Sequence, residues 1–350
     1  MYTAKTARSL NAVILLLTAT LSLPWLNGCQ SQQVFQQRFL QFGTIIDISL
    51  VSTDRQQAEQ VFDEIAQLLE TRQHEWHGWE KGTLSQFNQA LTQPTQEGVP
   101  IPETLQQLVR ESKKYYTLSE GLFNPALGRL IAAWGFHASS DPDFETIQLI
   151  KQNLPGMDDL RISQQRAYST NPHLQLDFGA IAKGLGVKQI AELVRLHQIR
   201  NFIINAGGDI FAQGKNPHRD WRIALQNPFG DGVLGSLSTS EAISVFTSGN
   251  YRRYYMDSNN KKRHHIIDPV TGEPSTNISA VTLMHADPVI ADIAATTLML
   301  TQPAQLKKMA TRLGIQDFLA ITEQHKLFIS QSMLNKIQWT QPEDLELHIL

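Results

Sequence analysis

Cysteine is almost absent from this sequence of 350 residues, which contains only Cys29. A single thiol cannot form an intramolecular disulfide, so the chain must fold without one. The formal net charge is only −3, which provides no long-range attraction for nucleic acid, and no nucleic-acid partner is expected. The sequence also lacks low-complexity tracts, internal repeats and a second long apolar run. Its length suffices for one large domain or two small ones with a substantial core.

The one apolar run, residues 12–23, has the layout of a secretory signal. Lys5 and Arg8 precede it, and it is too short to span a bilayer comfortably. It leads into residues 26–29 (LNGC), where a small residue before the cysteine resembles a bacterial lipobox. In a lipobox the cysteine becomes the lipidated N-terminus of the mature protein. The alternative is an incidental cysteine behind an uncleaved anchor.

These features predict how the chain is divided. Residues 1–28 are expected to be a lipoprotein signal peptide, Cys29 the lipidation site, residues 29–40 a tether, and residues 41–350 the folded domain. The mature protein is then expected on the periplasmic side of a bacterial membrane, which it would contact through its lipid anchor.

Apolar periodicity in the folded part alternates between strand-like and helix-like segments. Alternating residues predict strands at 43–52, 174–178, 221–228 and the end of 241–249, and helical spacing predicts helices at 54–73, 102–119, 287–301 and 303–313. The polar stretch 138–165 is expected to be an exposed insertion without chemistry. Hairpin-like turns separate the strands as often as helices do, which favours an α+β fold with antiparallel sheets that carry helices on one face.

The stretch LQLDFGAIAKGLGVK, residues 174–188, is the strongest candidate for a site. Asp177 follows the predicted strand, glycines allow a ligand to approach the backbone, and Lys183 lies in the first turns of the next helix. This combination suits a nucleotide phosphate with its metal ion. A glycine-containing corner between a strand and a helix is an equally good interpretation of this stretch alone.

Other segments offer weaker candidates, each with a structural alternative. Trp79 could stack on a planar ligand or cap the edge of a core. Thr247 and Ser248 offer hydroxyl groups for phosphate oxygens, and His265 or Asp268 could perform acid/base chemistry near neutral pH. Adjacent histidines on a strand point to opposite faces, so His265 and its neighbour are not expected to share a metal.

Asp292 and Thr296 lie four residues apart in a predicted helix. A carboxylate and a hydroxyl group on one helical face are suitable hard ligands for Mg²⁺ when substrate phosphates complete the coordination shell.

Two adjacent glycines in NAGGDI, residues 205–210, lie at the end of a strand, where bare backbone can approach a ligand or make a tight bend.

Seven blocks in order resemble the ApbE family of flavin transferases: FGT, FNPALGRLIAAWGF, LDFGAIAKG, NAGGDI, TSGNYRRYY, HHIIDPVTGEP and ADIAATTLML. The resemblance implies a two-lobed, T-fold-like architecture with FAD between the lobes. It implies a Mg²⁺-dependent enzyme that transfers FMN from FAD to a Thr or Ser hydroxyl of an exported acceptor protein, for example a subunit of a membrane redox pump, and releases AMP.

The resemblance also implies roles for individual residues. The metal ligands would be Asp292, Thr296 and the main-chain carbonyl of Ala180, and His265 would be the base that deprotonates the acceptor. FAD would lie against a larger set: Phe42, Trp79, Leu122, Phe123, Asn124, Asp177, Lys183 and Ile266, with Thr247 and Ser248 as secondary phosphate contacts.

Four positions depart from the family pattern. Asn124 and Asn250 stand where Asp is usual or frequent, Lys188 occupies a commonly acidic position, and Ala295 replaces a carboxylate found in some relatives. These departures keep open a flavin-binding lipoprotein without turnover. A FAD pyrophosphatase that uses the same site, lets water attack and yields FMN and AMP is the other alternative.

Overall fold

The computed structural model describes residues 31–93, 97–136, 140–251, 254–258, 260, 262–340 and 345–350. The predicted signal peptide, residues 1–28, and the predicted lipidation site Cys29 lie outside these residues. Over the described part of the chain, no helix has both the length and the apolar character needed to cross a membrane.

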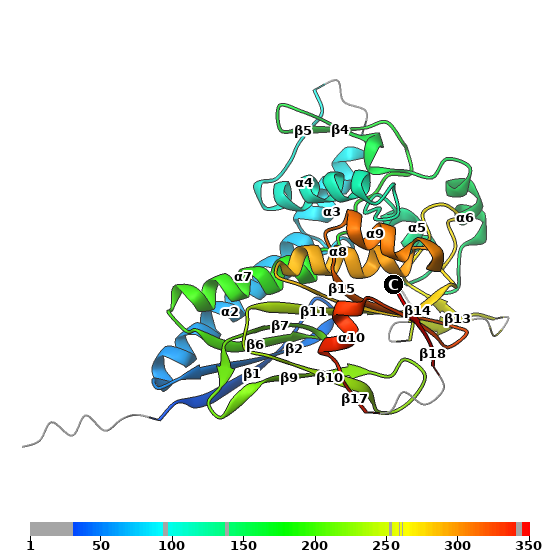
Figure 1. Ribbon diagram of the computed structural model, residues 1–350. Helices are drawn as coiled ribbons and strands as arrows, with labels where there is room; N and C mark the ends of the chain where they lie inside the picture. The colour runs from blue at the N-terminus through cyan, green and yellow to red at the C-terminus, as the bar shows by residue number, and fades with distance from the viewer. Residues whose placement is uncertain are drawn as a thin grey trace, which may run out of the picture.

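A nine-stranded sheet forms the centre of the described structure (Figure 1), in the order β1-β2-β6-β7-β11-β14-β15-β16-β18. Neighbouring strands are antiparallel except for the pair β16 and β18 at one edge. The strands are β1 (Gln33–Gln41), β2 (Thr44–Ser52), β6 (Asn201–Ala206), β7 (Asp209–Gln213), β11 (Ile243–Gly249), β14 (Ile278–His285), β15 (Asp317–Thr322), β16 (Lys326–Ile329) and β18 (Glu346–Ile349).

Three helices cover one face of this sheet: α2 (Arg55–Trp76), α7 (Ala182–Leu196) and α8 (Pro288–Met299) (Figure 1). Their apolar faces pack with the sheet into the main hydrophobic core. Local sequence fixes where two of them begin, since the carboxylates of Asp54 and Asp287 accept backbone N–H groups in the first turns of α2 and α8. Pro288 occupies the first turn of α8, where its missing N–H has no helical partner to lose.

A smaller sheet covers the opposite face (Figure 1), in the order β17-β10-β9-β8. A second apolar cluster lies between the two sheets and includes Trp221, Ile223 and Leu237 from the small sheet and Val245 and Ile321 from the large one. The strands are β8 (Lys215–Asn216), β9 (Arg219–Gln226), β10 (Val233–Thr239) and β17 (Gln338–Trp339).

The remaining elements lie mainly beyond the helical layer (Figure 1). They are α3 (Thr83–Leu91), α4 (Glu103–Leu118), α5 (Gly128–Ala133), α6 (Phe144–Lys151), the 3-10 turns η1 (Met157–Asp159) and η2 (Pro303–Gln305), α9 (Leu306–Arg312), α10 (Gln331–Lys336), the small sheet of β3 (Val99–Pro100), β5 (Arg166–Ser169) and β4 (Leu160–Ser163), and the hairpin of β12 (Tyr254–Met256) and β13 (Lys262–His264). The mostly antiparallel sheets, with helices on one face of the large sheet, confirm the expected α+β class.

Two predicted segments differ from the structure. Most of the predicted tether, residues 29–40, is part of the fold, because β1 begins at Gln33 and pairs along its length with β2. The predicted insertion, residues 138–165, contains α6, whose Ile147 and Ile150 are fully buried in a third apolar cluster with Trp134. That segment therefore packs as part of the domain.

Candidate functional site

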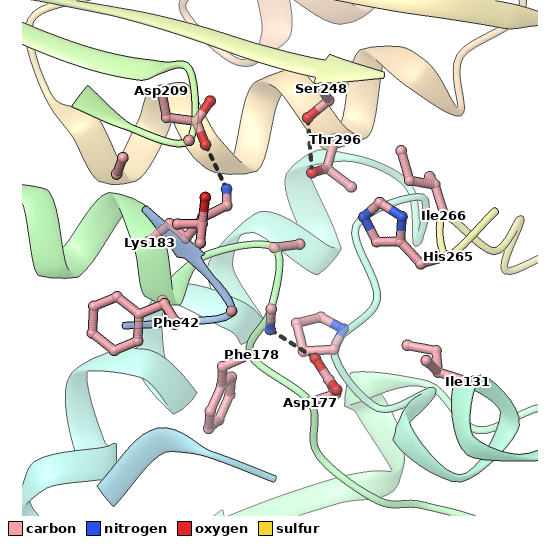
Figure 2. A pocket seen from close by; sticks show the side chains of 18 of the residues that line it. Phe42, Ile131, Asp177, Phe178, Lys183, Asp209, Ser248, His265, Ile266 and Thr296 are labelled. Atoms are coloured by element: carbon pink, nitrogen blue, oxygen red, sulfur yellow. Dashed lines mark hydrogen bonds and ion pairs between the residues drawn. The ribbon is translucent and has the colours of Figure 1, made fainter. Parts of the chain in front are cut away.

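A cavity of about 1000 Å³ opens beside the ends of several strands, close to the upper limit for small-molecule pockets. Its walls come from the β1–β2 turn, the ends of α2, β6 and β11, residues 122–127, 177–183 and 265–267, and α8. Figure 2 shows several of these side chains around it. The predicted site residues that line it are Phe42, Trp79, Leu122, Phe123, Asn124, Asp177, Ala180, Lys183, Thr247, Ser248, His265, Ile266 and Thr296. Asp292 lies just behind this wall and is 2% exposed.

The β1–β2 turn brings Phe42 to the cavity in an unusual backbone conformation. Phe42 has φ = 55° and Gly43 has φ = 66°, the left-handed pair that a tight hairpin turn requires. A bulky residue rarely adopts this conformation, so its surroundings must hold it. The Phe42 N–H donates to Gln73 Oε1 at 2.9 Å, and its ring stacks on Trp76 with ring centroids 6.1 Å apart.

The predicted strand at residues 174–178 is wrong, although its side chains alternate between buried and half-buried as expected. The segment is extended, but it forms only one isolated bridge, between Gln175 and Leu127. Asn88 of α3 takes the place of a neighbouring strand, because its Nδ2 donates to Leu176 O and its Oδ1 accepts from Leu176 N–H, both at 2.8 Å. Asp177 N–H donates to Pro125 O at 2.9 Å. A helix and a turn therefore hold this segment in place.

Asp177 organises the lower wall of the cavity (Figure 2). Its Oδ1 accepts the Gly179 N–H at 2.7 Å, and its Oδ2 accepts the indole N–H of Trp79 at 3.1 Å. These bonds fix the turn that precedes α7 and direct the indole of Trp79 toward the carboxylate. The hydrogen bond between Trp79 and Asp177 was not anticipated from the sequence.

Lys183 joins two buried carboxylates from different elements. Its ammonium group donates to Asp209 Oδ2 at 2.6 Å and to Asp292 Oδ1 at 3.0 Å (Figure 2 shows the former). Backbone groups hold the other two carboxylate oxygens: Thr247 N–H donates to Asp209 Oδ1 at 3.0 Å and Gly184 N–H to Asp292 Oδ2 at 2.8 Å. Every carboxylate oxygen of this cluster thus has a partner.

Burial and charge act in opposite directions on these groups. Burial raises the pKa of Asp292, and the Lys183 ammonium opposes that rise. For Lys183, burial alone would lower the pKa, but the charges of Asp209 and Asp292 outweigh it, so the pKa of the ammonium lies above its usual value. Lys183 therefore stays charged at neutral pH.

Close helix packing makes this arrangement possible. A Cβ atom at Gly184 would lie 2.5 Å from Pro288 O and 2.8 Å from Asp292 Cβ. Only glycine lets α7 and α8 approach closely enough for the Gly184 N–H to reach the carboxylate.

At the hairpin turn between β6 and β7, Gly207 has φ = 65° and lies against Thr44, which explains one glycine of NAGGDI as a tight bend.

The donors predicted to hold Mg²⁺ lie at the wall of one cavity or directly behind it. Ala180 and Thr296 line the same cavity, and Asp292 lies one turn before Thr296 on α8. Thr296 Oγ1 and Ser248 Oγ are 3.4 Å apart (Figure 2). These are hard oxygen donors, and each Asp292 oxygen keeps a second lone pair beside its hydrogen bond, so the set fits Mg²⁺. Over the described residues, no three His, Cys, Asp or Glu side chains cluster as a metal site.

The two adjacent histidines separate as expected. His264 is buried and its Nε2 lies 2.5 Å from Ser275 O, whereas His265 lines the cavity. Backbone bonds close the loop around them, since Ser275 N–H donates to Ile266 O at 3.0 Å and Asp268 N–H to Glu273 O at 2.8 Å. Asp268, the other acid/base candidate, does not line the cavity.

The four departures from the family pattern have local explanations. Asn124 donates to Pro155 O at 2.8 Å and accepts the Ala126 N–H at 3.1 Å, a combination that an aspartate cannot make. Lys188 donates to Asp287 Oδ2 at 2.6 Å, and Asn250 donates to Glu323 Oε1 at 2.6 Å. Ala295 is 1% exposed and packs in the main core. Its side chain does not face the cavity, so alanine at this position takes no carboxylate away from the cavity wall.

The architecture and the cavity define an α+β protein with a cavity of small-molecule size whose wall carries hard oxygen donors. The sequence model of the ApbE family matches residues 42–319, and the chain belongs to that family. This confirms the resemblance found in the sequence.

Several relatives carry the name FAD:protein FMN transferase. The protein from Rhodobacter capsulatus is 30% identical over 306 residues, which are 86% of this chain and 58% of the relative. The protein from Klebsiella pneumoniae is 34% identical over 57% of this chain and 63% of its own length. The chain thus spans less than two thirds of each of these relatives. For a Vibrio cholerae relative, 32% identical, the match covers 67% of this chain and 72% of the relative.

Solved structures share the fold. The flavin transferase ApbE from Vibrio cholerae superimposes with a TM-score of 0.76 at 25% identity, over 87% of this chain and 99% of that one. The ApbE protein from Thermotoga maritima gives a TM-score of 0.77 at 23% identity, over 87% of this chain and 99% of that one.

Two residues of the site were missed from the sequence. In the sequence, the two glycines before Asp209 are the stronger signal, although a carboxylate directly after a tight turn is itself a signal. Asn88 gave no local signal, since its partner Leu176 lies far along the chain. Both act through contacts that only the folded chain creates.

Proposed function

We propose that this protein is a Mg²⁺-dependent flavin transferase that moves FMN from FAD to a Thr or Ser hydroxyl of an acceptor protein and releases AMP. One observation carries the proposal: residues 177–183 and the C-terminal half of α8, distant in the sequence, line one cavity and bring Ala180 and Thr296 to it. The names of the relatives support the same activity.

In the proposed reaction the acceptor oxygen attacks the FMN phosphorus of FAD. A new P–O bond forms, the P–O bond to AMP breaks, and the hydroxyl proton leaves with a base. Such phosphoryl transfer depends on positioning and on charge stabilisation rather than on covalent help from the protein. His265 is the proposed base, because it lines the cavity and its loop is closed by backbone hydrogen bonds.

The proposed roles of the other residues follow from their places in the cavity wall. Asp292, Thr296 and the Ala180 carbonyl would hold Mg²⁺, which when bound would neutralise charge on the diphosphate. Lys183 supplies a permanent positive charge at the same wall. Phe42 and Leu122 offer apolar contact for a ring system, and Thr247 and Ser248 offer hydroxyl groups.

The location of the protein is also a proposal. The signal-like residues 1–28 and the lipobox-like Cys29 support an exported lipoprotein, anchored at the periplasmic side of a bacterial membrane. A membrane anchor would place the site near exported acceptors, for example subunits of membrane redox pumps. Mass spectrometry of the membrane fraction would show a lipid-modified N-terminus at Cys29, and an unmodified, uncleaved N-terminus would contradict this location.

One experiment tests the activity. Purified protein, FAD, MgCl₂ and a co-expressed exported flavoprotein domain are combined, and intact-mass spectrometry reads covalent FMN on the acceptor while chromatography reads AMP. The proposal expects both, and omission of MgCl₂ should remove both. Free FMN with AMP and an unlabelled acceptor would show a pyrophosphatase instead. Bound FAD without AMP would show a binding protein without turnover.

A further inference from the structure

We propose that Asp209 is a positioning residue that favours divalent-cation binding at Asp292, because it takes up most of the charge of the Lys183 ammonium that contacts both carboxylates. The inference rests on the magnesium site of the proposed function and adds a residue to it. Asp209 lies on β7 and Asp292 on α8, and Lys183 of α7 donates to both carboxylates. Figure 2 shows Lys183 and Asp209 directed toward each other.

Charge is unbalanced among these three side chains. One ammonium group faces two carboxylates, and the carboxylate side chains are only 6% exposed for Asp209 and 3% for Asp292. A buried carboxylate without a full positive partner is costly in free energy, which favours the entry of another cation. The cluster therefore attracts a cation before any substrate phosphate arrives.

The distances show which carboxylate holds the ammonium more tightly. The contact of Lys183 Nζ with Asp209 is 2.6 Å, against 3.0 Å with Asp292. Asp209 is itself fixed by the Thr247 N–H at 3.0 Å, so the short contact lies on a rigid strand end. Asp209 and Lys183 thus form a nearly neutral pair, and the uncompensated negative charge falls on Asp292, the predicted metal ligand.

This assignment predicts an order of cation affinities. In Asp209→Asn the ammonium has only Asp292 left to neutralise, so it competes with the metal ion and affinity should fall about tenfold or more. In Lys183→Met two carboxylates remain without a counter-charge, and affinity should rise. The double variant restores a single uncompensated carboxylate, so its affinity should return close to that of the unmodified protein.

The test uses Mn²⁺ as a paramagnetic probe for a hard-oxygen site, with free Mn²⁺ followed by electron paramagnetic resonance in the absence of FAD and acceptor. Asn at position 209 still offers an oxygen to the Thr247 N–H, which keeps the local backbone bond. Asp47→Asn is the matched control. It removes the same charge from the cavity rim, where Asp47 pairs with the exposed Arg38 instead of Lys183, and it should leave Mn²⁺ affinity within about twofold.

Compensation in the double variant is the decisive result. If Asp209→Asn binds Mn²⁺ as tightly as the unmodified protein, or if the double variant binds no better than Asp209→Asn, the positioning role is wrong. Should Asp209→Asn fail to fold, Lys183→Met and Lys183→Arg carry the test, with tighter binding expected for Met and unchanged binding for Arg. The predicted affinities without any FMN transfer would contradict the proposed function but leave this inference standing.

Discussion

Asn88 provides the sharpest test of how the site is supported. This side chain is 6% exposed and makes two hydrogen bonds of 2.8 Å to the backbone of Leu176, directly before Asp177. Asn88→Ala removes both partners and leaves one buried N–H and one buried C=O unsatisfied. Each such group costs about 1–3 kcal/mol. We expect the free energy of unfolding to fall by about 2–6 kcal/mol, toward the low end if water enters the space.

Urea unfolding followed by intrinsic fluorescence measures this loss, and the KM for FAD measures its effect on the site. KM should rise because Asp177 and the Trp79 indole lose their fixed position. Gln89→Ala, one residue along α3 at an exposed position, is the matched control and should stay within about 0.5 kcal/mol. If Asn88→Ala costs no more than the control and leaves KM unchanged, the side chain does not support this segment.

The remaining predictions concern the cation cluster and the histidines. Asp292→Ala should abolish Mg²⁺-dependent turnover while circular dichroism stays unchanged; retained turnover would remove it from the site. Gly184→Ala should lower the free energy of unfolding by about 1–3 kcal/mol, because its Cβ would lie 2.5 Å from Pro288 O, and an unchanged thermal midpoint would argue against this close packing. His265→Ala should slow transfer to protein more than it weakens FAD binding, measured by stopped-flow and by titration; equal losses would contradict a base role. Burial lowers the pKa of His264, so the unfolded chain takes up a proton near pH 6.5 before the native state does, and stability should fall as the pH drops below about 6.5. His264→Gln should flatten that dependence in urea unfolding at several pH values.

Local signals in the sequence predicted several of the helices and strands, including α2, α4, α8 and β2. The helices expected at 54–73 and 287–301 begin where the apolar spacing predicted, as α2 and α8, and the structure shows Asp54 and Asp287 as their N-caps. Strand β2 follows its alternation of apolar residues. Strand β1 was missed because it lies at the edge of the sheet, where only Phe35 is buried along Gln33–Gln41, so the apolar pattern is weak.

Elements that depend on distant partners could not be derived in this way. The residues around Leu176 carry the alternation of a strand, but their backbone groups bond to Asn88 and Pro125, which no local pattern reveals. The cluster of Asp209, Lys183 and Asp292 joins three segments that are far apart in the chain. For α6 the signal was present, since Ile147 and Ile150 have helical spacing, but the polar flanks outweighed it.

The departures from the family pattern bear on whether the protein turns over FAD or only binds it. A chain that had lost catalysis would be expected to lose groups at the cavity wall. At Ala295 the side chain faces the core, and Lys188 and Asn250 are engaged by Asp287 and Glu323. These substitutions therefore remove no group from the wall. Asn124 does line the cavity, but its amide is committed to Pro155 and Ala126, which fixes the turn rather than leaving a gap.

The groups that the proposed reaction would use remain present: a fixed lysine charge, oxygen atoms on α8 and at Ala180, and a histidine at the wall. A protein that only binds flavin needs apolar walls and shape, and has no use for a buried pair of carboxylates around an ammonium group, which is expensive to maintain. That cost favours turnover over binding alone. Release of AMP from FAD under Mg²⁺ is the observation that separates the two, because a pure binding protein leaves the diphosphate intact however tightly it holds the ring.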